Sequence, residues 1–217
     1  MRALNSGDFL FLLLAARWTV LLSVSAFVGG GIIGIAIALL RTSTSATARA
    51  VAMAYIQLFQ GTPLLLQLFL VFFGSDMMGL ELGPWVSATL GLSLNAGAFL
   101  GEIWRGAIQS VPKAQSEAAM ALGLHYLPRM RLVVLPQALR IATAPTVGFL
   151  VNLVKSTSLA AVIGFVELTR AAQLLNNATF RPFTVFFSVA VLYFLLCWPL
   201  TIASRRLERR LAVATQR

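Results

Sequence analysis

Charged and metal-ligating side chains are scarce in this sequence. Charged residues make up 11% of its 217 positions, whereas a soluble domain has roughly a quarter. So few charges do not cover a surface exposed to water, which excludes an ordinary soluble domain. The single cysteine, Cys197, and the single histidine, His125, exclude an internal disulfide, a cysteine zinc site and a multi-histidine metal cluster.

Lysine is also rare, and no lysine stands in a nucleotide-binding P-loop motif. A phosphate-binding P-loop needs the sequence Gly-Lys-Ser/Thr, but Pro112 precedes Lys113 and Val154 precedes Lys155. The chain therefore lacks this means of holding ATP. No serine or aspartate has a spacing to His125 that suggests a catalytic triad. We therefore predict that the chain is not an enzyme and binds no cofactor.

Long apolar runs dominate what is present. Hydrophobic residues make up 59% of the chain and the mean hydropathy is +0.85. Crossing a hydrocarbon core of about 30 Å takes roughly 20 helical residues, and spans of this kind must be helices here because too few strands are present to close a barrel. We predict an all-α membrane protein with one domain, residues 1–217, and five spans at about 18–40, 50–73, 84–104, 143–166 and 183–203.

A shorter apolar run, residues 9–16, precedes the first span. A cleaved signal peptide is one interpretation, but Asp8 and the lack of a small-residue cleavage site argue against it. The run more closely fits an amphipathic helix that lies on the membrane surface and leads into the first span.

The distribution of basic residues sets the orientation, because cytoplasmic loops are enriched in Lys and Arg. An N-out, C-in topology places Arg2, Arg17, Arg170 and Arg181 outside. It places three times as many inside: Arg41, Arg49, Arg105, Lys113, Arg129, Arg131, Arg140, Arg205, Arg206, Arg209, Arg210 and Arg217. The net charge of +10 therefore reflects topology, and we expect no nucleic-acid partner.

The longest cytoplasmic segment, residues 105–141, is predicted to contain two short helices. Ser110 and Pro112 are typical of a helix start, the helix is expected over 113–122, and Gly123 suits a left-handed stop. A second helix is expected from Pro128. Such a pair either caps the bundle or presents a surface to a partner.

Particular residues of this loop resemble a known signature. Glu117-Ala118-Ala119, Gly123 and Leu135-Pro136 resemble the EAA motif of ABC importer permeases. Other segments resemble the polar amino acid branch of that family: Gln60-Gly61-Thr62-Pro63-Leu64, Gly101-Glu102-Ile103-Trp104-Arg105-Gly106, Ile108-Gln109-Ser110-Val111-Pro112-Lys113, Leu135-Pro136-Gln137-Ala138-Leu139-Arg140 and Lys155-Ser156-Thr157-Ser158-Leu159. Two positions depart from it: Gln60 stands where arginine is common, and Ser156 where Asp or Asn is common.

The resemblance implies a type I importer fold in the bacterial cytoplasmic (inner) membrane. It also implies that the loop's first helix docks on a cytoplasmic ABC ATPase dimer, which binds ATP and Mg. The expected function is import of a polar amino acid or opine-like derivative. Further expected partners are a second permease copy or a homologous permease, an extracytoplasmic substrate-binding protein and membrane lipid.

Three groups of polar residues lie at similar depth in the predicted spans. Because polar groups in a bilayer are costly, they usually face a cavity or the bundle interior. We predict that these line the substrate pathway, although hydrogen bonding between helices is an equally plausible role for the uncharged ones. They are Gln57, Gln60 and Thr62; Asn95; and Asn152, Lys155, Ser156, Thr157 and Ser158. Lys155 carries a charge, so it is expected to meet a substrate carboxylate or a polar gate.

Two other functions compete with this one. An intramembrane enzyme would need several acidic, histidine or serine groups at membrane depth, and Lys155 is the one charge predicted there. A stand-alone channel or secondary transporter for a small polar solute would not need the long cytoplasmic helix pair. Purification with an ATPase subunit would separate these alternatives from an ABC permease.

Overall fold

The computed structural model describes residues 4–215, with side chains to residue 209, and its regular structure in that range is helical. The longer helices are α1 (Ser6–Thr42), α2 (Ala46–Gly61), α3 (Leu64–Met77), α4 (Pro84–Gln109), α7 (Leu135–Ser156) and α9 (Pro182–Thr215). The shorter ones are α5 (Lys113–Ala121), α6 (Tyr126–Arg129), the π-helical turn η1 (Met130–Val134), the 3-10 helix η2 (Thr157–Ile163) and α8 (Leu168–Thr179).

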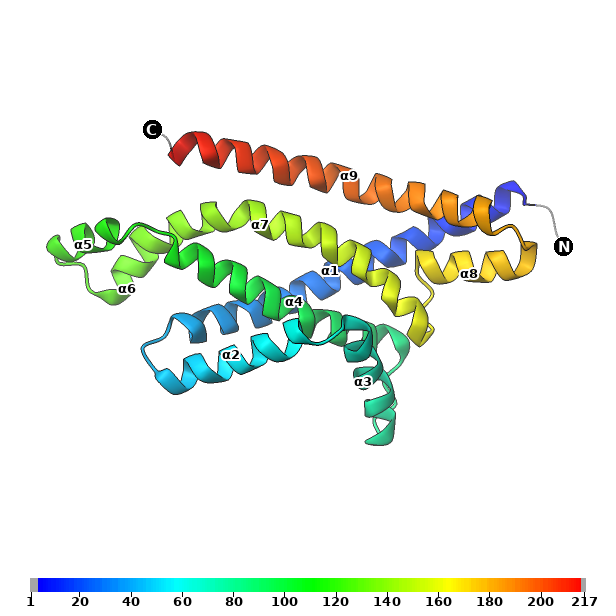
Figure 1. The fold of residues 1–217 in the computed structure, drawn as a ribbon, viewed down its shortest axis with the longest axis horizontal. Helices are drawn as coiled ribbons and strands as arrows, with labels where there is room; N and C mark the ends of the chain where they lie inside the picture. Colours follow the sequence, from blue (N-terminus) through cyan, green and yellow to red (C-terminus); the bar gives the residue numbers. More distant parts are fainter. Residues whose placement is uncertain (1–3, 216–217) are drawn as a thin grey trace.

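Within residues 4–215, four segments, containing α1, α4, α7 and α9, are long and apolar enough to cross a membrane, and the bent pair α2–α3 makes a fifth if it counts as one span. In Figure 1, α1, α4, α7 and α9 run broadly along the long axis. The start of α1 and α8 lie at one end, whereas α5, α6 and the end of α9 lie at the other. The helical fold class is confirmed. Among the basic residues that set the predicted topology, Arg2, Arg217 and the side chain of Arg210 lie outside the described part.

The α1–α4 contact is the closest in the bundle because both helices offer small residues there. A Cβ atom added at Gly30 would lie 2.5 Å from the Cβ of Ala96, and one at Gly101 would lie 2.6 Å from the Cγ2 of Ile37. Small residues let helix backbones approach closely, which is a common way of packing helices in membranes. Leu22 and Leu92 are fully buried in the adjoining core.

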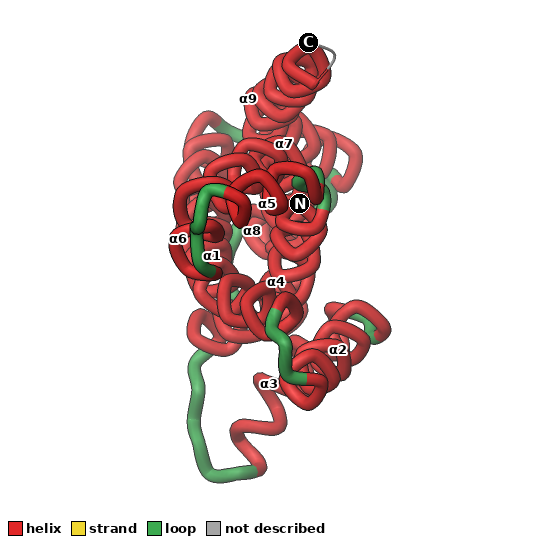
Figure 2. Tube along the Cα trace, turned by 90° about the vertical axis from the view of Figure 1, so that its left-hand side faces the viewer, coloured by secondary structure: helices red, strands yellow, loops and turns green. Residues whose placement is uncertain are grey.

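The second predicted span is broken into α2 and α3. The two helices meet at an angle of 103°, so α3 projects away from the bundle axis (Figures 1 and 2). Thr62 has extended backbone angles (φ −116°, ψ 145°), because a residue that precedes proline is disfavoured in the helical region. The sequence predicted an interruption at this point, and the structure shows a sharp turn of the chain.

The N-terminal run does not form a separate surface helix, so that prediction is wrong. Residues 9–16 are the start of α1, which is continuous from Ser6 to Thr42 and is capped by Asn5 and Asp8. Leu12 and Ala15 are buried against α8 and α9. Because this face packs on other helices, the segment continues the bundle instead of lying apart from it.

The fourth predicted span and the cytoplasmic loop are bounded differently from the prediction. α4 runs on to Gln109 and α7 begins at Leu135, so both ends of the expected loop, residues 105–141, extend the neighbouring helices. Regular helix in the fourth span ends at Ile163, where Gly164 takes a left-handed conformation (φ 84°).

Candidate functional site

The cytoplasmic loop forms a platform at one end of the bundle, which we define as α5, the turn at Gly123, α6 and η1. Gly123 has φ +77°, and this left-handed turn ends α5 as the sequence predicted. The predicted role of Ser110 is wrong: Ser110 closes the end of α4, and its hydroxyl donates to the Gly106 carbonyl. Pro112 occupies the cap position of α5 without a side-chain cap.

The platform presents large apolar side chains to the outside. Leu122 and Leu127 are 81% and 77% exposed, and they flank the Gly123 turn. Glu117 and Ala118 are exposed as well, whereas Ala119 is buried. Exposed apolar residues gathered on one projection are typical of a surface that binds another protein.

A small apolar cluster joins the platform to the bundle. Val111, Val134 and Ala138 are buried together, with Trp104 and Met130 packed against them. Leu135 and Pro136 start α7, where proline is tolerated because the first helical N–H groups need no partner. Of the expected motif, Ala119 is buried and Leu135 is half-buried, whereas the exposed members are Glu117, Ala118, Gly123 and Pro136.

The polar residues around the α2–α3 break form one hydrogen-bonded cluster. Gln67 donates to the Phe59 carbonyl at 2.8 Å, to the Thr62 carbonyl at 3.0 Å and to the Thr62 hydroxyl at 2.9 Å. Asn95 donates to Gln67 Oε1 at 3.0 Å and to the Phe59 carbonyl at 3.2 Å. The structure therefore brings Thr62 and Asn95 together, through a glutamine that our predicted site omitted although it lies in the same span.

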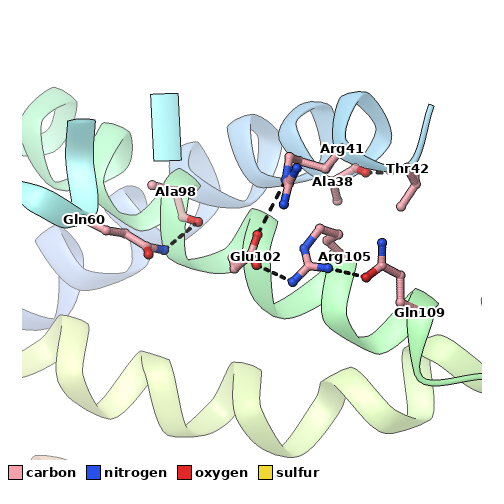
Figure 3. A network of polar contacts seen from close by, with 8 residues as sticks. All are labelled: Ala38, Arg41, Thr42, Gln60, Ala98, Glu102, Arg105 and Gln109. Carbon is pink, nitrogen blue, oxygen red and sulfur yellow. Dashed lines mark hydrogen bonds and ion pairs between the residues drawn. The ribbon is translucent and has the colours of Figure 1, made fainter. Parts of the chain in front are cut away.

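Two further glutamines of the predicted pathway face a cavity. Gln57 and Gln60 line a space of about 450 Å³ between α1, α2 and α4. Gln60 also donates to the Ala98 carbonyl of α4 at 3.3 Å (Figure 3).

The predicted pathway residues around Lys155 lie outside the cavity that Gln57 and Gln60 line. Lys155 is exposed and lines a crevice of about 570 Å³ against α9, with Tyr193, Trp198 and Arg205. This crevice shares no lining residue with the cavity that contains Gln57 and Gln60. Within one chain the structure therefore does not gather all the predicted pathway residues around a common space.

The polar neighbours of Lys155 mostly bond their own helix. The hydroxyls of Ser156, Thr157 and Ser158 donate to backbone carbonyls three or four residues earlier, at 2.9, 2.7 and 2.7 Å. Thr157 is also buried, whereas Asn152 is exposed. These bonds run within one helical segment and not between helices, as the alternative role would require. Lys155 and Asn152 are exposed.

At the opposite end of the bundle, the fully buried Glu167 caps α8, and the sequence pattern did not single it out. Its carboxylate accepts backbone N–H bonds from Thr169 and Arg170, each at 2.9 Å, and the Tyr193 hydroxyl at 2.7 Å. Burial raises the pKa of this carboxyl, although these bonds oppose that shift. Because Ser, Thr, Asp and Asn are the usual N-cap residues, a glutamate does not signal a helix start in the sequence.

None of the described residues forms a group of three or more His, Cys, Asp or Glu side chains able to hold a metal ion. His125 lies exposed at the start of α6.

The comparisons with known proteins decide the family. Residues 30–213 match the model of the binding-protein-dependent transport system inner membrane component. The chain belongs to this family. It is 37% identical over 205 residues to the probable amino-acid ABC transporter permease protein YckA of Bacillus subtilis, a match that covers 94% of this chain and 91% of the relative. It is 36% identical over 200 residues to the glutamine transport system permease protein GlnP of Escherichia coli, with 91% of each chain covered.

Solved structures agree with this membership. This chain superposes, with a TM-score of 0.88, on a chain from the crystal structure of an amino acid ABC transporter with histidines. The two are 29% identical, with 96% of this chain and 100% of that chain covered. The MetNI methionine ABC transporter, at a TM-score of 0.80 and 21% identity, supports the fold. The predicted ABC permease class and its location as a multi-pass inner-membrane protein are confirmed.

Proposed function

We propose that this permease carries a polar amino acid, received from a separate substrate-binding protein, across the cytoplasmic membrane, with energy from a separate ATPase dimer that binds ATP and Mg. Two relatives and one solved structure support the substrate class, because their names concern amino-acid or glutamine transport.

The observation that carries the coupling role is the platform. Leu122 and Leu127 project at the end of the bundle that carries α6 and the end of α9. Glu117 and Ala118 are exposed on α5, and Gly123 turns the chain so that α5 and α6 present one surface. We assign the docking of the ATPase to this surface. The buried cluster around Val111, Val134 and Ala138 supports this surface on the bundle, and we assign Ala119, Leu135 and Pro136 to the same coupling element.

The pathway is proposed to run past the polar residues near the α2–α3 break. Irregular backbone at membrane depth is tolerated where it lines a cavity or is buried in protein, and discontinuous helices of this kind often form binding sites. Gln57, Gln60, Thr62 and Asn95 lie at this break, and a second permease, a copy or a homologue, would complete the space. Asn152 and Lys155, with Ser156, Thr157 and Ser158 nearby, are assigned to a second part of the pathway, beside the crevice that Lys155 lines against α9.

Reconstitution tests this function directly. The permease is combined with its ATPase and its substrate-binding protein in proteoliposomes, and uptake of labelled glutamine, histidine, arginine and cystine is measured with and without internal ATP. We expect ATP-dependent uptake of at least one of them, and none when the binding protein is omitted. Uptake that needs neither ATP nor the ATPase would instead identify a secondary transporter.

A further inference from the structure

An apolar groove of about 330 Å³ lies where the end of α1, the end of α4 and the start of α7 meet. These three helix ends point toward the platform (Figure 1). In the N-out, C-in topology that the basic residues predict, this is the cytoplasmic end of the bundle. The groove is lined by apolar side chains from all three helices, among them Ile35, Leu39, Trp104, Ile108, Leu135 and Leu139.

Trp104 closes the inner side of the groove without leaving a polar atom free. Its Nε1 donates to the Thr146 hydroxyl of α7 at 3.0 Å. Its ring lies against α1, where a Cβ atom added at Gly34 would come within 3.2 Å of it. A polar ligand group placed here would lose its hydrogen bonds to water and find none in return. The segment of a ligand that fits this groove is therefore a hydrocarbon chain.

The rim of the groove is open to the outside of the chain. Leu39 and Leu139, on opposite sides of it, are 58% and 67% exposed. Both belong to segments that are long and apolar enough to cross the membrane. A groove between two such helices faces the acyl chains of the lipid unless another protein covers it.

Two basic residues lie beside the groove, and no acidic residue lines it. Arg131, in η1, stands one turn before Leu135, at the platform end of the groove. Arg140 follows Leu139 on the exposed side of α7. Both arginines are exposed, and neither has a hydrogen bond or an ion pair to another described residue. Basic sites between membrane helices on the cytoplasmic side favour anionic lipid headgroups.

We propose that this groove binds an anionic phospholipid of the cytoplasmic leaflet, with one acyl chain lying in it. Arg131 receives the phosphate, because the planar guanidinium donors match phosphate oxygens, and Arg140 adds positive charge beside it. The groove lies on the membrane side of Arg131, which is the order of acyl chain and phosphate in a phospholipid. This site is separate from the proposed transport function, since it needs neither substrate nor ATP.

Trp104 supplies a reporter because its ring lines the groove. The permease–ATPase complex is placed in phosphatidylcholine nanodiscs that contain the same small fraction of either phosphatidylglycerol or phosphatidylcholine with brominated acyl chains. Bromine quenches tryptophan fluorescence on contact, and the Trp104 signal is the difference between the wild type and Trp104→Phe. We expect brominated phosphatidylglycerol to quench this signal several-fold more strongly than brominated phosphatidylcholine does.

Charge variants test the selection of the headgroup. A basic residue near an anionic membrane surface strengthens association by about fivefold, so Arg131→Gln and Arg140→Gln should each weaken the preference for phosphatidylglycerol several-fold. The double variant should lose the preference, whereas Arg131→Lys, which keeps the charge, should retain most of it. Arg206→Gln is the matched control, because Arg206 is an exposed cation near the end of α9 that lines no part of the groove. It should behave as the wild type does.

A second readout does not depend on tryptophan, and it decides the matter if Trp104→Phe does not assemble. Phosphatidylglycerol that remains with the purified complex is measured by mass spectrometry. The wild type and Arg206→Gln should retain more of it than the double variant of Arg131 and Arg140. Equal retention in all three would contradict the proposal.

Three fluorescence results would also overturn the proposal. Equal quenching by the two brominated lipids would mean that the groove accepts any acyl chain. An equal loss of preference in Arg206→Gln would indicate general attraction of anionic lipid to the basic end of the bundle. No quenching by either lipid would mean that a protein, such as the second permease or the ATPase, covers the groove.

Discussion

The Asn95 side-chain amide donates to Gln67 Oε1 at 3.0 Å and so joins α4 to α3 directly beside the break between α2 and α3. The Gln67 side-chain amide in turn donates to the backbone carbonyls of Phe59 and Thr62, which precede α3. One buried glutamine therefore satisfies backbone groups that the broken helix leaves free, and it fixes the direction in which α3 departs.

Gln67→Leu is expected to destabilise the permease by about 2 kcal/mol, because hydrogen bonds between helices in membranes average about 0.6 kcal/mol each and this change removes several. The loss is measured as a lower midpoint of thermal unfolding in detergent. Gln57→Leu is the matched control, since Gln57 is exposed and unbonded, and it should leave the midpoint unchanged. Equal midpoints for both variants would show that Gln67 does not hold the break.

Glu167→Ala is expected to lower stability by about 1–3 kcal/mol, because it removes the cap of α8 and leaves the Tyr193 hydroxyl without its acceptor. The midpoint of thermal unfolding should fall, and protease sensitivity should rise first around α8. Glu81→Ala, at an exposed acid of the α3–α4 connection, serves as the control. A variant as stable as that control would contradict the capping role.

How much of the fold can be predicted from the sequence depends on whether the interactions that form each feature are local or join residues distant in the sequence. Apolar runs locate α1, α4 and α9 because each must match the thickness of the membrane, and Gly123 predicts its own turn because the need for positive φ is local. The 103° bend begins at Thr62-Pro63, which the sequence identifies, but Gln67 and Asn95 bond to each other beside it, and no local pattern specifies that pairing.

The burial of Glu167 likewise depends on residues that are distant in the sequence. Thr19 and Tyr193 lie 148 and 26 positions away from it, and both contact its carboxylate. The local hydropathy pattern therefore gives no sign that Glu167 is buried. α8 is missed for a related reason. Leu168 and Leu175 are buried against residues of α1 and α9, and most of a helix's stability in a protein comes from such packing and not from local propensity.

The topology is tested by cysteine labelling in a Cys197→Ala background. A cysteine in place of Asn177, exposed on α8, should react with a membrane-impermeant maleimide in intact cells. A cysteine in place of Glu208, exposed near the end of α9, should react only after the membrane is opened. The reverse pattern would contradict the N-out, C-in orientation that the basic residues predict.

Lys155→Met is expected to reduce ATP-driven uptake at least tenfold while the complex assembles normally, because the exposed ammonium group is assigned to the pathway. Arg205→Met removes the other cation of the same crevice and tests whether positive charge in general is required. Assembly is followed by co-purification of the ATPase. Normal uptake by Lys155→Met, or loss of the ATPase from the complex, would argue against the pathway role.

The most direct test of the account is the ATPase activity that loaded binding protein stimulates in proteoliposomes, measured for variants at Gly123 and Glu117. Gly123 has φ +77° and no atom within 4 Å of an added Cβ, so Gly123→Val strains the backbone by about 1 kcal/mol or more without a clash inside the chain. Gly123→Asn should be tolerated, because asparagine adopts this conformation more readily. We predict that Gly123→Val and Glu117→Lys stay in the membrane but lose stimulation or the bound ATPase, and that Gly123→Asn retains both. Wild-type stimulation with the ATPase still bound in Gly123→Val and Glu117→Lys would contradict the assignment of coupling to the platform.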